Sequence, residues 1–263
     1  MNTEIIKAAI LGVVEGVTEF LPVSSTGHLI LAGDMLGFTG DTAKTFEVFI
    51  QLGAILAVVW LYRDKISATI KGIGTKKTNR FLLNLMIAFL PAAFFGFMTH
   101  SYIKRHLFNP VTVAYALIAG GIAIYVIERV VKKPVVRDVD EVSFKQALGI
   151  GMAQTLSLFP GVSRAGATIM GGMCSGLERK AATEFSFFLA IPTMFAATSY
   201  DLFKTFHNLT MNDLPVFAAG FLVSFLSAFF VIKAFLGFVA RYTFNSFAIY
   251  RVIFGALVLY YYL

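Results

Sequence analysis

One short stretch of the chain, EFLPVSSTGHLIL at residues 19–31, gathers side chains that could do chemistry within an otherwise apolar sequence. Its polar members are a carboxylate, three hydroxyls and an imidazole: Glu19, Ser24, Ser25, Thr26 and His28. A second carboxylate, Glu15, precedes Glu19 by four residues, and a helix would place both on one face. Such groups can hold a cation, attack an electrophile and transfer protons.

The two carboxylates repel each other unless they share a proton or a cation. Carboxylate oxygens, completed by phosphate oxygens of a substrate, are the hard ligands that Mg²⁺ or Ca²⁺ prefers. The nearby sequence offers no second histidine and no cysteine, which disfavours zinc. We therefore expect Glu15 and Glu19 to bind a divalent metal, Mg²⁺ or Ca²⁺, with a hydrogen-bonded structural pair as the alternative.

A second stretch, PGVSRAGAT at residues 160–168, supplies the opposite charge. Arg164 lies at the predicted start of a helix, where backbone N–H groups favour anions, and its planar guanidinium suits phosphate oxygens. The alternative is an interfacial arginine whose head group reaches water. The residues that we expect to line the substrate site in the two stretches are Ser24, Thr26, Gly161, Ser163, Gly166 and Thr168.

Together these parts predict metal-assisted phosphoryl transfer, in which catalysis is chiefly positioning and charge neutralisation. Ser25 is the candidate nucleophile. His28 follows three residues later, so a helical turn would place its ring on the same face, where it could take or return a proton. Glu19 could instead be the base or orient the histidine, and an activated water could replace Ser25; the sequence leaves these assignments open.

The elements that carry these residues are predicted to lie in a membrane. The 263-residue chain is 57% hydrophobic and 14% charged, with a mean hydropathy of +0.76, which is typical of an integral membrane protein. We predict an all-α fold with six transmembrane helices, the first and last of which carry Glu47 and Arg251. The predicted spans are residues 46–62, 81–99, 111–127, 185–200, 214–232 and 244–262.

Residues 1–40 and 144–178 are helical in pattern but are interrupted by proline and glycine, and neither half of either segment can cross a bilayer. Paired segments of this kind predict two re-entrant helix-loop-helix hairpins that meet at a site near the midplane. We expect the guanidinium of the second hairpin to face the acidic and hydroxyl groups of the first across a gap the size of a diphosphate.

Charge predicts the topology. Two loops are rich in lysine and arginine: residues 63–80 and residues 129–145, the second including Lys132 and Lys133. We therefore place both loops in the cytoplasm. With six spans, this places both chain ends outside. The net charge of +7 therefore reflects topology rather than nucleic-acid binding. The single cysteine, Cys174, excludes an intramolecular disulfide.

An internal duplication follows from the motifs themselves. Aligning EFLPVSSTG with SLFPGVSRAG pairs Ser24 with Ser163 and Ser25 with Arg164. We interpret residues 1–263 as a single membrane domain composed of two inverted-topology repeats, 1–131 and 144–263. Inverted repeats also occur in secondary transporters, many of which bind anions at such a site, so a carrier is the rival interpretation, alone or in addition to hydrolysis.

The motifs EGVTEFLPVSSTGH and PGVSRAGAT, with GDTAKTFEVFIQLGAILAVV and ATEFSFFLAIP, resemble those of the bacterial undecaprenyl pyrophosphate phosphatase family, also called the bacitracin-resistance protein family. The resemblance covers essentially the whole chain. It implies a multi-pass protein of the bacterial cytoplasmic membrane that removes one phosphate from the C55 polyprenyl pyrophosphate carrier, recycling it for peptidoglycan synthesis, in a divalent-metal-dependent reaction on the outer side.

The resemblance also carries the family's catalytic pattern onto five positions of this chain. These positions are Glu15, Glu19, Ser25, His28 and Arg164. The sequence leaves open which metal is used, the preferred prenyl length and whether the chain forms a homodimer. It also leaves open whether the protein is a carrier or flippase of polyprenyl phosphate, alone or in addition to hydrolysis.

Overall fold

The computed structural model describes residues 2–131, 134–205 and 210–263; Lys132 and Lys133 of the second basic loop lie outside them. The described residues form helices and no strand, apart from one isolated bridge between Val136 and Leu177. The α-helices are α1 (Asn2–Thr18), α2 (Ser25–Met35), α3 (Asp41–Leu61), α4 (Arg63–Lys71), α5 (Lys76–His106), α6 (Pro110–Val130), α7 (Phe144–Thr155), α8 (Arg164–Cys174), α9 (Arg179–Thr205), α10 (Leu214–Val239) and α11 (Asn245–Tyr262). Short 3₁₀ turns are η1 (Val139–Glu141), η2 (Leu156–Leu158) and η4 (Met211–Asp213).

Five of the described helices, α3, α5, α6, α9 and α10, are long and apolar enough to cross a membrane. The prediction of an all-helical multi-pass membrane protein is therefore confirmed. The sixth predicted span forms α11 but is not among the five, because Asn245 and Arg251 lower its mean hydropathy. The segment before residue 81, which we predicted as a cytoplasmic loop, is largely helical in the structure. It contains α4 and the first turn of α5.

The helical breaks lie where the prolines and glycines predict them. Between α1 and α2 the chain is non-helical from residue 19 to 24, and between α7 and α8 it loops through η2 up to residue 163. Ser24 and Ser163, which the two motifs align, are each the residue immediately before a helix. Ser24 has a φ of 71°, the one positive value among described non-glycine residues.

Small residues allow the helices to approach closely. A Cβ atom at Gly12 of α1 would lie 2.5 Å from the carbonyl oxygen of Gly220 in α10, and one at Gly16 would overlap that of Ser224. A Cβ atom at Gly121 of α6 would lie 2.7 Å from the carbonyl oxygen of Ala248 in α11. Such contacts are how helices associate in lipid, and the first of them draws the helical face around Glu15 into the protein interior.

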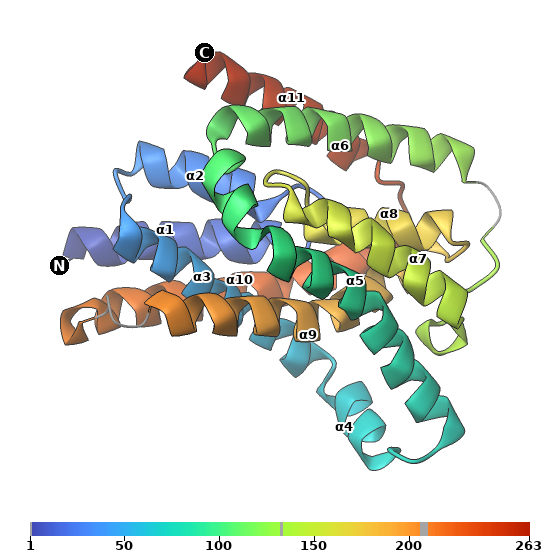
Figure 1. Cartoon of the computed structure of the whole chain (residues 1–263). Coiled ribbons are helices and arrows are strands. Elements are labelled where there is room, and N and C mark those ends of the chain that lie inside the picture. The colour runs from blue at the N-terminus through green and yellow to red at the C-terminus, as the bar shows by residue number, and fades with distance from the viewer. Residues whose placement is uncertain (1, 132–133, 206–209) are drawn as a thin grey trace.

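The two basic loops, predicted to share one side of the membrane, contact each other. Asp140 of η1 accepts hydrogen bonds from Lys65 of α4 at 2.6 Å and pairs with Lys77 of α5 at 2.9 Å. In Figure 1, α4 lies at the end of the bundle opposite to both labelled chain termini. The fold therefore separates a basic end from the end that carries the N- and C-termini.

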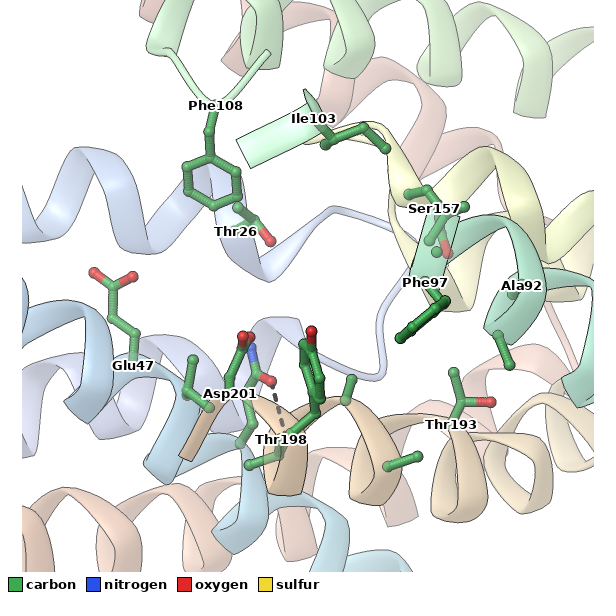
Figure 2. Close-up of a pocket in the computed structure, with 18 of the residues that line it drawn as sticks. Thr26, Glu47, Ala92, Phe97, Ile103, Phe108, Ser157, Thr193, Thr198 and Asp201 are labelled. Carbon is green, nitrogen blue, oxygen red and sulfur yellow. Dashed lines mark hydrogen bonds between the residues drawn. The ribbon is translucent and has the colours of Figure 1, made fainter. Parts of the chain in front are cut away.

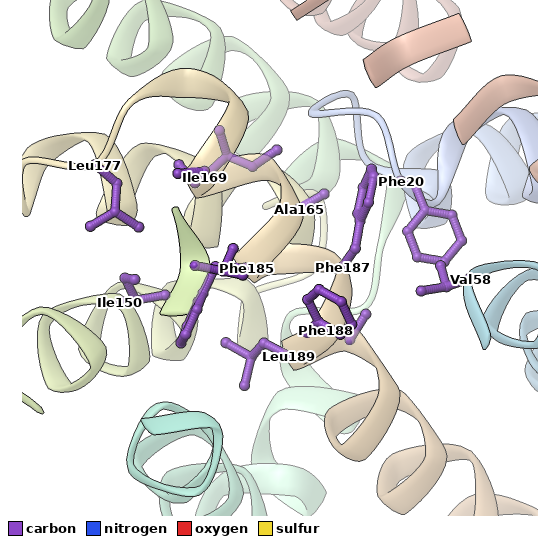
Figure 3. Close-up of a cluster of buried hydrophobic side chains, with 14 of the residues drawn as sticks. Phe20, Val58, Ile150, Ala165, Ile169, Leu177, Phe185, Phe187, Phe188 and Leu189 are labelled. Atoms are coloured by element: carbon purple, nitrogen blue, oxygen red, sulfur yellow. The ribbon is translucent and has the colours of Figure 1, made fainter. Parts of the chain in front are cut away.

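The main apolar core lies between the loop after α1 and helices α3, α7, α8 and α9 (Figure 3). Phe20, the residue after Glu19, is fully buried and meets Phe187 of α9 edge to face, with ring centroids 5.4 Å apart. An aromatic ring of this size buries a large apolar area. Phe20 therefore anchors the first motif loop to the core and holds Glu19 in place.

Candidate active site

Three of the predicted catalytic residues meet at one point. The Ser25 hydroxyl donates a 2.5 Å hydrogen bond to Oε2 of Glu19, and Nη2 of Arg164 donates a 3.1 Å hydrogen bond to Oε1 of the same carboxylate. The side chains of Glu19 and Arg164 are only 8% and 11% exposed. The carboxylate of Glu19 thus joins the hydroxyl from the start of α2 to the guanidinium from the start of α8.

This arrangement corrects one detail of the expectation from sequence. Arg164 does not face the acidic group across a diphosphate-sized gap; it forms a direct ion pair with Glu19. A buried guanidinium without an anion is costly, so the carboxylate occupies the position that would otherwise be left for a phosphate. An anion that binds Arg164 would share the guanidinium with Glu19 or displace it.

Arg164 is held from several sides. Its Nη1 donates to the backbone oxygen of Ser186 at 3.2 Å, its Nη2 approaches Sδ of Met194 at 3.1 Å, and the guanidinium lies 5.5 Å from the centroid of Phe20. Thr168, one of the predicted substrate residues, is fully buried and shares a 2.6 Å hydrogen bond with the Ser186 hydroxyl. Thr168 therefore supports the surroundings of Arg164.

Glu15 lies on α1, four residues before Glu19, and is fully buried. Neither of its carboxylate oxygens has a hydrogen-bond partner among the described residues. A buried carboxylate without partners is costly unless it is protonated or binds a cation. The described part of the chain contains no group of three or more His, Cys, Asp or Glu residues that could hold a metal, so any ion here would rely on two carboxylates and on oxygens from substrate or water, as Mg²⁺ commonly does.

His28 has partners other than Ser25. Its Nδ1 lies 2.7 Å from the backbone oxygen of Ser24, and its Nε2 lies 2.6 Å from the hydroxyl of Tyr250 in α11. Because a carbonyl only accepts, Nδ1 carries the proton, and in the neutral ring Nε2 accepts from the tyrosine. Phe254 stacks on the imidazole with centroids 4.2 Å apart. The expected Ser25–His28 pair is therefore not formed, and His28 is turned toward α11.

The Tyr250→Phe variant should lower turnover by about 2- to 10-fold, the range expected for one lost hydrogen bond, because it removes the donor to Nε2 of His28 and retains the ring. The measurement is the steady-state turnover of the purified variant. The control is Tyr242→Phe, the same substitution at an exposed tyrosine. Unchanged turnover would show that the hydrogen bond has no role in the reaction.

The remaining predicted substrate residues shape the two loops. The Ser163 hydroxyl accepts from the backbone N–H of Gly166 at 3.0 Å and donates to the backbone oxygen of Leu21 at 3.2 Å, a direct link between the loops. Gly161 has a φ of +91° and touches α6 so closely that a Cβ atom would meet the backbone oxygen of Val113 at 2.5 Å. Ser163 and Gly161 therefore build the loops.

A cavity of about 680 Å³ is bordered by residues of α2, α3, α5 and α9 (Figure 2). Ser25, Glu19 and Arg164 are not among its lining residues. It is lined by Thr26, which follows Ser25, and by Thr193, which precedes the Arg164 neighbour Met194. Its polar lining residues include Lys44, Glu47, Gln51, Thr198 and Asp201, and its large apolar ones include Phe89, Phe97, Ile103, Phe108 and Leu158. The cavity thus has both polar and apolar lining residues, and it borders the residue that follows the candidate nucleophile.

Several residues of the site were not predicted from the sequence. Phe20, Ser186 and Met194 surround Arg164 but carry no signal that distinguishes them from packing residues. Tyr250 and Arg251 come from α11, more than two hundred residues after the first motif. Arg251 alone had a signal, since a charge within an apolar span is by default a candidate functional group.

Comparison with known proteins places this geometry in a family. Residues 8–257 match the family described as bacitracin resistance protein BacA. A protein named undecaprenyl-diphosphatase from Methylobacillus flagellatus is 52% identical over 263 residues, covering 98% of each chain. Proteins of the same name from Aromatoleum aromaticum and Nitrosomonas europaea are each 54% identical, covering 96% and 97% of this chain and 92% and 93% of their own. With a match across nearly its whole length, the chain belongs to the bacitracin resistance protein BacA family.

Proposed function

We propose that this protein hydrolyses undecaprenyl pyrophosphate to undecaprenyl phosphate and inorganic phosphate, and so returns the lipid carrier to peptidoglycan synthesis. The name of its relatives supports the substrate. The observation that carries the chemistry is the chain of contacts Ser25–Glu19–Arg164, because it joins a hydroxyl, a base and a cation suited to phosphate. A cavity with an apolar wall borders Thr26, the residue after Ser25.

In the proposed mechanism, Oγ of Ser25 attacks the terminal phosphorus while Glu19 accepts the hydroxyl proton. The bond between that phosphorus and the bridging oxygen breaks, and the lipid monophosphate leaves with the bridging oxygen. Glu19 then passes its proton to the leaving group or to solvent. Water, activated by the same carboxylate, cleaves the phosphoserine and releases inorganic phosphate with regeneration of Ser25.

Charge stabilisation in this mechanism comes from Arg164 and from two helix starts. Backbone N–H groups at the N-terminus of a helix favour an anion. The first residue of α2 is Ser25 and the first of α8 is Arg164, so both helix ends belong to the cluster. The side chain of Ser24 makes no capping hydrogen bond to α2, which leaves the N–H groups of that end available to phosphate oxygens.

Glu15 and Glu19 would hold a divalent metal, Mg²⁺ or Ca²⁺, whose charge would help to neutralise the pyrophosphate. Exhaustive chelation should therefore reduce phosphate release by at least about 10²-fold, the equivalent of a few kcal/mol of lost charge stabilisation. Added Mg²⁺ or Ca²⁺ should restore it, and Glu15→Gln should raise the metal concentration needed. Full turnover in chelator would contradict a metal requirement.

For the membrane we propose six spans, with α11 as the sixth, and two re-entrant hairpins, α1–α2 and α7–α8, in inverted repeats. The helix contacts are consistent with this repeat. In such a repeat α7 is the counterpart of α1, and α10 is the counterpart of α5. The contact between α1 and α10 in one half then has its equivalent in the contact between α7 and α5 in the other. The counterparts α3 and α9 contact each other, and so do α6 and α11. The basic end of the bundle would face the cytoplasm, and the cavity would open toward the outer side of the cytoplasmic membrane.

The test of the function is release of inorganic phosphate by the purified protein from undecaprenyl pyrophosphate in detergent. We expect one phosphate per lipid and undecaprenyl phosphate as the other product. Sealed proteoliposomes loaded with undecaprenyl phosphate separate hydrolysis from transport. Movement of the lipid across the bilayer without phosphate release from the pyrophosphate would overturn the proposal in favour of a carrier.

A further inference from the structure

Arg251 of α11 is only 1% exposed, yet it is a cation in the middle of the helix. It donates four hydrogen bonds, and all four acceptors are backbone oxygens. Nη1 reaches the oxygen of Pro22 at 3.1 Å, Nη2 reaches those of Gly161 and Ala116 at 3.1 Å each, and Nε reaches that of Leu117 at 3.2 Å. No acidic side chain pairs with Arg251 in the described ranges of the chain.

The four acceptors belong to three segments. Pro22 lies in the loop between α1 and α2, Gly161 lies in the loop between α7 and α8, and Ala116 and Leu117 lie on α6. One guanidinium therefore ties both motif loops to each other and to a helix that spans the bundle. Gly120 of α6 leaves the space for it, because a Cβ atom there would overlap the guanidinium.

Burying a cation at membrane depth without a counterion costs several kcal/mol, so its position calls for an explanation. The two loops carry different parts of the site, since Glu19 and Ser25 flank the first loop and Arg164 follows the second. Besides Arg251, the two loops are joined by the Ser163–Leu21 hydrogen bond, by the Glu19–Arg164 ion pair and by the guanidinium of Arg164 over the ring of Phe20. The ion pair is one that a bound diphosphate would disturb, whereas the Arg251 bonds go to backbone oxygens and involve no charged partner.

We propose that Arg251 is the positioning residue that sets the distance between the two motif loops, and thereby holds Ser25 in line with the phosphate bound at Arg164. The role rests on the proposed phosphatase function. Arginine is required because its planar fork directs its N–H groups at several carbonyls at once, whereas a lysine ammonium offers three donors from one point. A misplacement of about 1 Å can cost on the order of 10²-fold in rate.

The experiment compares Arg251→Lys and Arg251→Gln with Arg241→Lys, a matched substitution at an exposed arginine of the same region. We expect Arg251→Lys to lower kcat by about 10²-fold with KM changed by less than about 3-fold. Amide hydrogen exchange should rise by at least about 10-fold in the loops at 19–24 and 156–163 and stay unchanged in α3 and α9. Arg241→Lys should alter neither measurement.

Hydrogen exchange needs no substrate, so it separates this inference from the phosphatase proposal. Unchanged exchange in both loops, or a rise spread evenly over the chain, would overturn the positioning role even if phosphate release is confirmed. Faster loop exchange with kcat within about 3-fold of the parent would overturn it as well. Failure of both Arg251 variants to fold would assign Arg251 to the stability of the whole chain and would also overturn it.

Discussion

The Ser25→Ala variant should lower kcat for undecaprenyl pyrophosphate hydrolysis by at least about 10⁴-fold, the scale on which removal of an attacking hydroxyl acts in enzymes with a covalent intermediate. Ser25 is the first residue of α2, and its hydroxyl donates to the proposed base, Glu19. Stability should change little, since Glu19 keeps its ion pair with Arg164. Phosphate release over extended incubation, corrected for the amount of folded protein, measures the effect.

Ser246→Ala, on an exposed face of α11, is the matched control and should retain full turnover. A ³²P-labelled phosphoserine should be trapped at position 25 by rapid acid quench of the parent protein. If Ser25→Ala keeps turnover within about 10-fold of the parent, the nucleophile is instead a water activated by Glu19, and no covalent phosphate should be found.

The Glu19→Gln variant should lower kcat by about 10³-fold, within the range attributed to a positioned general base. The amide cannot take the Ser25 proton. It also cannot satisfy both neighbours as the carboxylate does, because if its oxygen faces the hydroxyl its NH₂ group meets the Arg164 donor. Arg164 would then be a buried cation without an anion, so thermal stability in detergent should fall, by about 3 to 5 kcal/mol if the pair behaves as other buried pairs do.

A double variant, Glu19→Gln with Arg164→Met, separates the two effects. Removing both charges leaves no unpaired ion, so the thermal stability should recover toward that of the parent. The activity should stay as low as in whichever single variant is less active. The double-variant cycle is measured by thermal unfolding and phosphate release on the same preparations. Additive losses of stability would contradict the ion pair between Glu19 and Arg164.

A large part of the site follows from residue types along the chain. Pro22 and the Pro160–Gly161 pair predict the two helix breaks, because proline lacks an N–H group and glycine permits a positive φ, as Gly161 shows. The cost of burying Glu15, Glu19 and Arg164 in an apolar chain predicts that they act together. The structure brings Glu19, Ser25 and Arg164 into contact and leaves Glu15 buried beside them, without a protein partner among the described residues.

His28 shows where local spacing ceases to be informative. Three residues after Ser25, it can share a helical face with that hydroxyl, yet its ring bonds to Ser24 and Tyr250 and stacks on Phe254. The direction of a side chain is chosen by what surrounds it, and here the surroundings come from α11. Spacing along one helix carries no information about a helix more than two hundred residues away.

The sequence by itself determined the membrane setting, the broken helices and the identity of the charged and hydroxyl groups, because these depend on composition and on local backbone chemistry. Tertiary structure alone decided that Arg164 pairs directly with Glu19, that Thr168 supports Ser186, and that Arg251 joins both loops. The physical reason is that such contacts depend on how helices approach one another, and glycine contacts such as Gly12–Gly220 and Gly121–Ala248 set that approach only in the folded bundle.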